Sequence, residues 1–262
     1  MAHRVQSLVL LSTDSKSIAN QRTLLLRPIQ PQQLLPHSQA SRLRIISLFE
    51  DLADDDLKRI AKSCSIKAHE RQAQIMGEHD QTNDVFFILD GMVRINSLSS
   101  AGREVVFTDA GPGNVFGEFA AVDGLPRSAT VFALTDCVLA RMSAAAFADL
   151  LRENGAVSFR LVELLVAKIR RMTERVFEVS ALAVRERVRR ELLRLVAAGE
   201  RAGVGTVIQP APTHYEIAAL IGTHREAVTR EFNRLEAERI IEVHRRQIRI
   251  LDLKRLEEPS GD

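Results

Sequence analysis

The chain has 262 residues and a formal net charge of +2. Its length allows two domains, and a charge so close to zero does not by itself indicate a nucleic-acid partner. The two cysteines, Cys64 and Cys137, lie far apart, which argues against a zinc site, an iron–sulfur cluster or a disulfide framework. The chain has no apolar run long enough to span a membrane and its first residues lack a secretory pattern, so we expect a cytoplasmic protein.

Residues 1–41 combine prolines, glutamines and serines with basic residues and a single acid, Asp14. This composition is typical of disorder, so we expect a disordered extension or a start codon assigned too far upstream. Ordered structure is expected from residue 42, in a first domain that covers 42–155. Apolar residues recur there at helical intervals around Asp54, Asp55 and Asp56, which are typical of a solvated helix start.

The region 65–142 has the pattern of an antiparallel β-structure. Short β-rich runs, such as residues 84–89 and 92–95, are separated by glycines. Short strands at regular spacing predict a sandwich or a barrel. Cys137 lies in one of the apolar runs and is expected to be a small buried side chain without a redox role.

A short turn within this region, residues 117–130, carries the groups that a cyclic nucleotide needs. Arg127 offers a planar fork of donors to a phosphodiester, Ser128 adds a hydroxyl, and Glu118 can accept a hydrogen bond from a ribose hydroxyl. Gly117 allows a close backbone approach, and a helical turn that opens after it would direct free N–H groups at the anion. A glycine-rich surface turn is the alternative, and the complete set of groups argues against it.

A long helix is expected over 156–182, and it holds a heptad pattern. Spacings of three and four indicate the seam of a parallel homodimer, while packing of a single helix on its own domain is the alternative. The seam residues are Val162, Leu165, Ile169, Met172 and Val176, continuing to Val179.

The segment 183–256 has the layout of a DNA-binding domain. A basic helix from Val184 to Ala198 comes first, and its arginines are expected to face outward. Two further helices flank the turn 221–223, which is the arrangement of a helix-turn-helix, and a hairpin follows as a wing. The arginines expected on the outer face of the basic helix are Arg185, Arg187, Arg189, Arg190 and Arg194.

The start of the second helix would read DNA bases. Arg225 can contact guanine O6 and N7, Glu226 can accept from cytosine N4, and Arg230 reaches the same groove. The remaining candidates are better placed for the phosphate backbone, and contacts of that kind carry no sequence information. They are Thr223 and His224 before the helix, and Arg245 and Arg246 at the tip of the wing.

Two motifs carry a resemblance to a known family. The Gly-Glu pair, a spacer with a glycine and the run Pro-Arg-Ser-Ala over 117–129 resemble the phosphate-binding cassette of cyclic-nucleotide-binding domains. Arg225 and Glu226 followed by Arg230 resemble the recognition helix of the catabolite activator proteins. The chain is therefore identified as a member of the Crp/Fnr transcription regulators, with the likeness covering 45–252, roughly four fifths of its length.

The resemblance implies an α+β fold: an N-terminal cyclic-nucleotide-binding β-roll (a double-stranded β-helix or jelly roll), a dimerisation helix and a C-terminal winged helix-turn-helix. It also implies a homodimer without enzymatic activity, cofactor or metal. The partners would be double-stranded DNA with a palindromic operator of TGTGA-like half-sites, and RNA polymerase. The effector would be cAMP. Its binding residues would be Gly117, Glu118, Phe119, Ala120, Arg127, Ser128, Met172 and Thr173.

Alternatives remain open at three points. Met172 and Thr173 fall where cAMP-responsive relatives present two hydroxyl groups to the purine, and only Thr173 keeps one, which leaves cGMP or no ligand as alternatives. The loop 199–212 is shorter than the polymerase-contacting loop of the relatives, so activation and repression are both open. Outside this class, a signalling module without DNA binding, or a metal sensor that uses His69 and His79, is the alternative.

Overall fold

The computed structural model describes residues 39–100, 102, 104–201 and 206–258. The extension expected over 1–41 falls outside these residues except for its last positions. Those positions begin a short helix, α1 (Gln39–Leu43). In the described part of the chain, no helix is both long enough and apolar enough to cross a bilayer.

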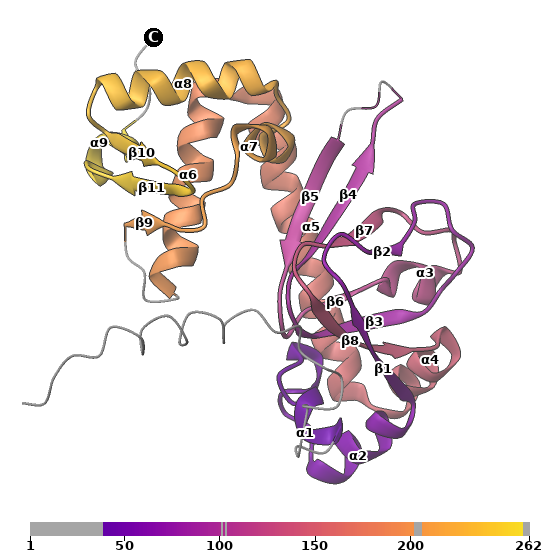
Figure 1. Cartoon of the computed structure of the whole chain (residues 1–262). Helices are drawn as coiled ribbons and strands as arrows, with labels where there is room; N and C mark the ends of the chain where they lie inside the picture. The colour runs from indigo at the N-terminus through magenta and orange to yellow at the C-terminus, as the bar shows by residue number, and fades with distance from the viewer. Residues whose placement is uncertain (1–38, 101, 103, 202–205, 259–262) are drawn as a thin grey trace, which may run out of the picture. The chain divides into compact units, whose positions relative to one another are not determined.

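Two four-stranded antiparallel sheets form the N-terminal domain, as the glycine-punctuated strands predict (Figure 1). The strand orders are β1-β8-β3-β6 and β2-β7-β4-β5, so each sheet joins strands that are distant in sequence. This arrangement is the expected β-roll. The strands are β1 (Cys64–His69), β2 (Gln74–Met76), β3 (Val85–Asp90), β4 (Val93–Leu98), β5 (Glu104–Ala110), β6 (Val115–Phe116), β7 (Thr130–Ala133) and β8 (Cys137–Met142).

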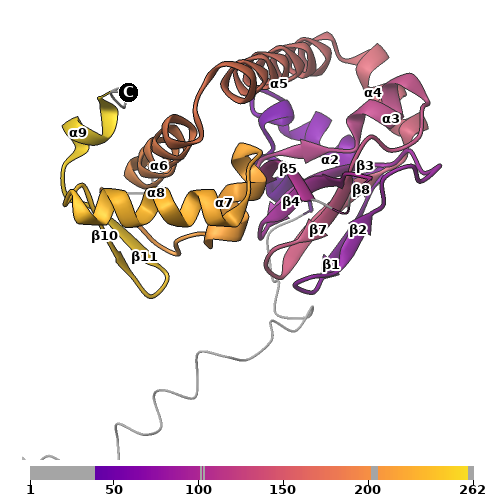
Figure 2. The same cartoon turned by 90° about the horizontal axis from the view of Figure 1, so that it is seen from above.

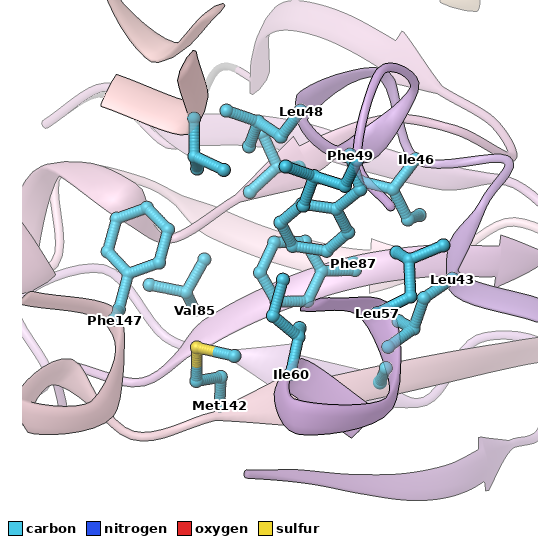
Figure 3. Close-up of a cluster of buried hydrophobic side chains, with 14 of the residues drawn as sticks. Leu43, Ile46, Leu48, Phe49, Leu57, Ile60, Val85, Phe87, Met142 and Phe147 are labelled. Carbon is cyan, nitrogen blue, oxygen red and sulfur yellow. The ribbon is translucent and has the colours of Figure 1, made fainter. Parts of the chain in front are cut away.

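Helices close one end of this roll around a core of aromatic side chains. The rings of Phe49 and Phe87 lie 5.0 Å apart and those of Phe87 and Phe147 lie 6.4 Å apart. Figure 3 shows these rings together with aliphatic side chains from helices and strands. Tilted aromatic pairs at such distances stabilise a core beyond the burial of their area. The elements concerned are the 3₁₀ turn η3 (Ser47–Phe49), α2 (Asp54–Lys62), α3 (Glu118–Asp123) and α4 (Ala144–Glu153).

The long helix α5 (Gly155–Ala181) begins at the N-cap Asn154, whose side chain accepts a hydrogen bond from the Val157 N–H. Its first turns belong to the core of the roll, because Val157 and Leu161 are buried there. Leu165 packs on the same core and is only partly buried. Leu165, one of the residues of the predicted dimer seam, thus packs within its own domain.

A second core holds the C-terminal helices and a small sheet, in the layout expected for a winged helix-turn-helix. Figure 1 draws α8 along the upper edge of this group of elements, and Figure 2, in the view from above, draws it between α6 and the hairpin of β10 and β11. Its core combines Val188 and Leu192 with Phe232, Ile241 and Ile248. The elements are α6 (Val184–Arg201), β9 (Val207–Ile208), α7 (His214–Ile221), α8 (Arg225–Ala237), β10 (Ile241–His244), β11 (Gln247–Ile250) and α9 (Leu253–Glu257), with the sheet in the order β10-β11-β9.

The expectation that all the arginines of α6 face outward is wrong for two of them. Arg187 and Arg189 are buried, with 8% and 5% exposure. Arg187 donates from Nη1 to the carbonyls of Ile221 and Gly222, and Arg189 donates from Nη1 to the carbonyl of Arg255. A buried guanidinium group needs hydrogen-bond acceptors. The carbonyls that accept from Arg187 and Arg189 belong to residues far from α6 in the sequence.

Candidate nucleotide-binding site and DNA interface

Gly117 opens the turn that was expected to bind an anion. Its φ of 81° is left-handed, which favours glycine, and α3 begins at the next residue. A Cβ at this position would lie 2.8 Å from the Arg127 Nη1 and 2.8 Å from the Asp84 carbonyl oxygen. Only glycine therefore allows the guanidinium to approach the backbone here.

Arg127 is the central cation of this site, and it is buried with 2% exposure. Its Nε donates to the Thr82 Oγ1 at 3.0 Å, its Nη1 to the Gly117 carbonyl at 2.9 Å and its Nη2 to the Asp84 carbonyl at 2.8 Å. Burial lowers the pKa of Arg127, and the charges of Asp84, Asp80 and Glu118 act against that shift. All three acceptors are uncharged, so the guanidinium is held in place without being neutralised by contact.

The hydrogen-bond inventory of Arg127 leaves donors for a ligand. A guanidinium has five N–H groups, and three of them are used in the contacts to Thr82, Gly117 and Asp84. Two N–H groups remain, one on each terminal nitrogen. A phosphodiester could accept from both without displacing the internal contacts.

Glu118 is the candidate acceptor for a ribose hydroxyl, and its carboxylate already has a partner. It is buried with 3% exposure, and the Lys168 Nζ donates to its Oε1 at 2.6 Å. The same ammonium group lies 3.4 Å from the Val115 carbonyl and 5.7 Å from the centre of the Phe119 ring. Lys168 therefore ties the long helix α5 to the start of α3.

Sequence reasoning did not find Lys168. The one available signal was its position on α5, four residues before Met172, which was already assigned to the ligand. A spacing of four places two residues on one side of a helix.

Of the other predicted ligand residues, only Phe119 contacts the charged side chains of this site within the described residues, through the Lys168 ammonium over its ring. Ser128 is exposed, Ala120 is buried and Phe119 is partly exposed. On α5, Met172 is half exposed, while the Thr173 hydroxyl donates to the Ile169 carbonyl of its own helix. The hydroxyl assigned to the purine is thus engaged in a local hydrogen bond.

An apolar stripe runs along α5 and includes most of the predicted dimer seam. Large hydrophobic side chains this exposed on a single helix are unusual, because burying apolar surface is favourable. Leu165 differs from the rest of the predicted seam because it packs on the core of the roll. The exposed residues are Phe159, Val162, Val166, Ile169, Met172, Val176, Phe177 and Val179.

The helix-turn-helix is fixed by caps at both ends of α7. Thr213 and Glu216 form a reciprocal capping box at its start. Gly222 ends the helix with a φ of 67°, and the buried Arg187 donates to the Ile221 carbonyl at 2.6 Å. The capping box fixes the start of α7, while Gly222 and the guanidinium contact fix where it stops, and therefore where α8 begins.

The side chains predicted to read bases are exposed on α8. In the described residues, Arg225, Glu226 and Arg230 make no side-chain hydrogen bond or ion pair. Arg234 on the same helix is paired with Glu231 and Glu238 instead. Arg225 also lies in the first turn, where a cation opposes the helix dipole, so helix stability does not explain it.

The residues predicted to contact phosphates lie in two places, just before α8 and at the tip of the hairpin formed by β10 and β11. Thr223 is half-buried and His224 is the exposed N-cap of α8. Arg245 and Arg246 connect β10 to β11, whose register pairs His244 with Gln247, and both arginines are exposed. The described residues therefore place two cations without ion pairs at the tip of the wing.

A contact between α7 and α8 was not expected from the sequence. The His214 Nδ1 lies 2.9 Å from the Thr229 Oγ1, and its ring centre is 4.5 Å from that of Phe232. Burial lowers the pKa of His214, the charge of Arg225 lowers it further, and Glu236 acts in the opposite direction. His214 thus supports the helix that carries the residues predicted to read bases.

The two histidines considered as metal ligands are not brought into a cluster. Within the described ranges, no group of three or more His, Cys, Asp or Glu side chains could hold a metal ion. Burial lowers the pKa of His69, and Lys67 adds to the effect.

Comparison with known proteins agrees with both parts of this geometry. Residues 66–154 match the family model of the cyclic nucleotide-binding domain, and residues 186–258 match that of the Crp-like helix-turn-helix domain. The chain belongs to the Crp/Fnr family of transcription regulators. It is a DNA-binding regulator with a cyclic nucleotide-binding domain, and the α+β fold predicted from the sequence is confirmed.

Several relatives of this Crp/Fnr regulator are transcription regulators. The cyclic AMP receptor protein of Thermus thermophilus is 28% identical over 80% of this chain and 95% of its own length. The cAMP-activated global regulator Vfr of Pseudomonas aeruginosa is 27% identical over 71% of this chain and 89% of its own. Among solved structures, the c-di-GMP-responsive regulator CLP of Xanthomonas campestris has a TM-score of 0.68 at 19% identity, covering 76% of this chain and 99% of that one.

Proposed function

We propose that this Crp/Fnr regulator is a cytoplasmic homodimer that binds a cyclic nucleotide, with cAMP as the first candidate, and then binds a palindromic operator. The observation that carries the nucleotide assignment is the guanidinium of Arg127. It is buried, it is held by three uncharged acceptors, and it keeps two free N–H groups. A buried cation without a contacting counter-ion needs an anion, and a cyclic phosphodiester supplies one negative charge.

The position of Lys168 supports a coupling between the ligand and the long helix. A ribose hydroxyl that donates to Glu118 would share or displace the Lys168 ammonium, which now lies 2.6 Å from the carboxylate. Lys168 belongs to α5, so ligand binding would change the contact between α5 and α3. Such a change shifts the populations of two helix arrangements only if the ligand binds one of them more tightly.

The exposed stripe of α5 supports the homodimer. A parallel partner helix would cover Val162, Ile169 and Val176, which are 54%, 62% and 66% exposed. Two copies related by a two-fold axis would present two α8 helices to successive major grooves, and a palindromic operator with TGTGA-like arms matches that symmetry. RNA polymerase remains a proposed partner.

A second candidate is a regulator that binds DNA without any nucleotide. The observation in its favour is that Glu118 already has a charged partner in Lys168 and that three internal acceptors hold Arg127 in place. The sequence also lacks one of the two hydroxyl groups that relatives present to the purine, since Met172 occupies that position.

Calorimetry separates the candidates. We expect the protein to bind cAMP, with cGMP and c-di-GMP as parallel titrations, and Arg127→Leu to bind none of them. If the protein binds cGMP and does not bind cAMP, cGMP becomes the proposed ligand. Absence of binding by all three, in a protein that still selects an operator from random DNA, would favour the ligand-independent regulator.

A further inference from the structure

The outward side of α8 carries one polar residue that the proposed DNA contacts do not use. The helix packs on its domain through Val228, Phe232 and Leu235, all of which are buried. Successive residues of a helix are rotated by about 100° around its axis. On this basis Arg230 and Asn233 both point within about 50° of the direction opposite to the three buried residues. Both residues are exposed. Asn233 therefore shares the face of α8 that is turned away from these buried residues, and Figure 1 draws α8 along one edge of the C-terminal elements.

The amide of Asn233 is not used within the protein. It makes no hydrogen bond to another described residue, whereas the neighbouring Thr229 hydroxyl is occupied by the Arg225 carbonyl at 3.0 Å and by His214 at 2.9 Å. Arg234, the next residue along the helix, is tied to Glu231 and Glu238. On this part of α8, the side chains with a structural role are paired, and Asn233 and Arg230 are not.

Local helix energetics do not explain Asn233 either. Asparagine is a poor residue for the interior of a helix, because its side chain competes for backbone groups in other conformations. Here it occupies the ninth position of the thirteen-residue helix Arg225–Ala237 and caps neither end. An exposed, unpaired asparagine in mid-helix thus lowers helix stability without a compensating contact in the protein.

Helix geometry places Asn233 next to a predicted base contact. Three residues along α8 correspond to about 4.5 Å of rise, slightly more than one base-pair step of about 3.4 Å. A carboxamide is the side-chain group that matches the N6 and N7 edge of adenine in the major groove. We propose that Asn233 reads an adenine at a base pair adjacent to the one contacted by Arg230. This proposal rests on the operator binding proposed above.

The test uses the operator that the wild-type full chain selects from random DNA, at one fixed salt concentration. Asn233→Ala should lose its preference at one base pair per half-site by roughly 5- to 100-fold and keep its preference at the others. Replacing that adenine by 7-deazaadenine, which lacks the N7 acceptor, should weaken binding of the wild type. The same replacement should leave Asn233→Ala unaffected, because variant and base analogue delete the same hydrogen bond.

Arg225→Ala is the matched control on the same helix. It should lose preference at a different base pair and stay sensitive to the 7-deazaadenine. The thermal midpoint of Asn233→Ala should equal or exceed that of the wild type, because alanine is the better helix former. A lower midpoint would assign Asn233 a structural role instead.

The outcomes distinguish this proposal from the function on which it rests. If the wild type selects no operator, the DNA-reading function fails. If the wild type selects one and Asn233→Ala selects the same one with unchanged preferences, only the assignment of Asn233 is wrong. Equal weakening of Asn233→Ala on all sequences would place the amide on the phosphate backbone and would also overturn the proposal.

Discussion

The Lys168 ammonium lies 2.6 Å from the carboxylate of Glu118, and this ion pair joins the long helix α5 to the start of α3. The Glu118 side chain is 3% exposed and that of Lys168 is 23% exposed. Removal of the lysine would leave a buried carboxylate without a charged partner, which costs more than the net contribution of the pair itself.

We predict that Lys168→Met lowers the free energy of unfolding by about 1 to 3 kcal/mol. Glu118→Gln in the same chain should restore part of that loss, because the buried group is then neutral. Urea unfolding of the two single variants and the double variant completes the cycle. A loss in the double variant that equals the sum of the two single losses would mean that the two residues do not interact.

Arg127→Leu should abolish binding of the cyclic nucleotide, at a cost of about 2 to 5 kcal/mol for a lost charge-assisted pair. It should also lower stability, because the carbonyls of Gly117 and Asp84 lose their donor. Thr82→Val is the control, since it removes only the acceptor of Arg127 Nε and leaves the terminal nitrogens free to bind the ligand. Calorimetric affinity that is unchanged in Arg127→Leu would refute the cassette assignment.

The exposed stripe of α5 predicts different results for two neighbouring residues. Ile169→Glu should give a folded monomer, because a carboxylate would face its symmetry mate across the seam. Leu165→Ala should remain a dimer and lose about 1 to 3 kcal/mol of stability, less than a fully buried leucine, because Leu165 packs on its own domain. Sedimentation at micromolar concentration checks both, and a dimeric Ile169→Glu would place the seam elsewhere.

The second helix of the helix-turn-helix and the turn that opens at Gly117 could be predicted from the sequence because each is a local pattern. Glu118, Arg127, Arg225 and Arg230 lie within short segments whose residue types define their chemistry. Lys168 could not be predicted in the same way, because its partner lies 50 positions away along the chain.

Two further errors have the same physical origin. Arg187 was expected on the surface because charge alone favours solvent, yet backbone carbonyls at the end of α7 accept its hydrogen bonds. Leu165 fits a heptad, but the repeat is similar for a seam between two chains and for a helix packed on its own domain. The periodicity of a helix shows which side chains form its apolar face, but it does not show whether that face packs on its own domain or on a second chain.

The lowered pKa of His214 predicts a dependence of stability on pH. The folded protein holds this imidazole less basic than the unfolded chain does, so the unfolded state binds more protons. The stabilisation is complete above the unfolded pKa of about 6.5 and is lost as the pH falls below it. His69 adds a contribution of the same sign. His214→Gln should therefore show a smaller fall in thermal midpoint between pH 7.5 and 5.5 than the wild type, and identical slopes would contradict this.

The central claim is that one cyclic nucleotide controls the binding of DNA, and reciprocal titrations test it most directly. The affinity for the selected operator is measured with and without saturating cAMP, and the affinity for cAMP is measured with and without operator. Linkage requires the two ratios to be equal, and we expect a factor of about 5 to 150 in favour of the doubly bound state. Operator binding of the same strength with and without cAMP, in a protein that binds cAMP, would contradict the account.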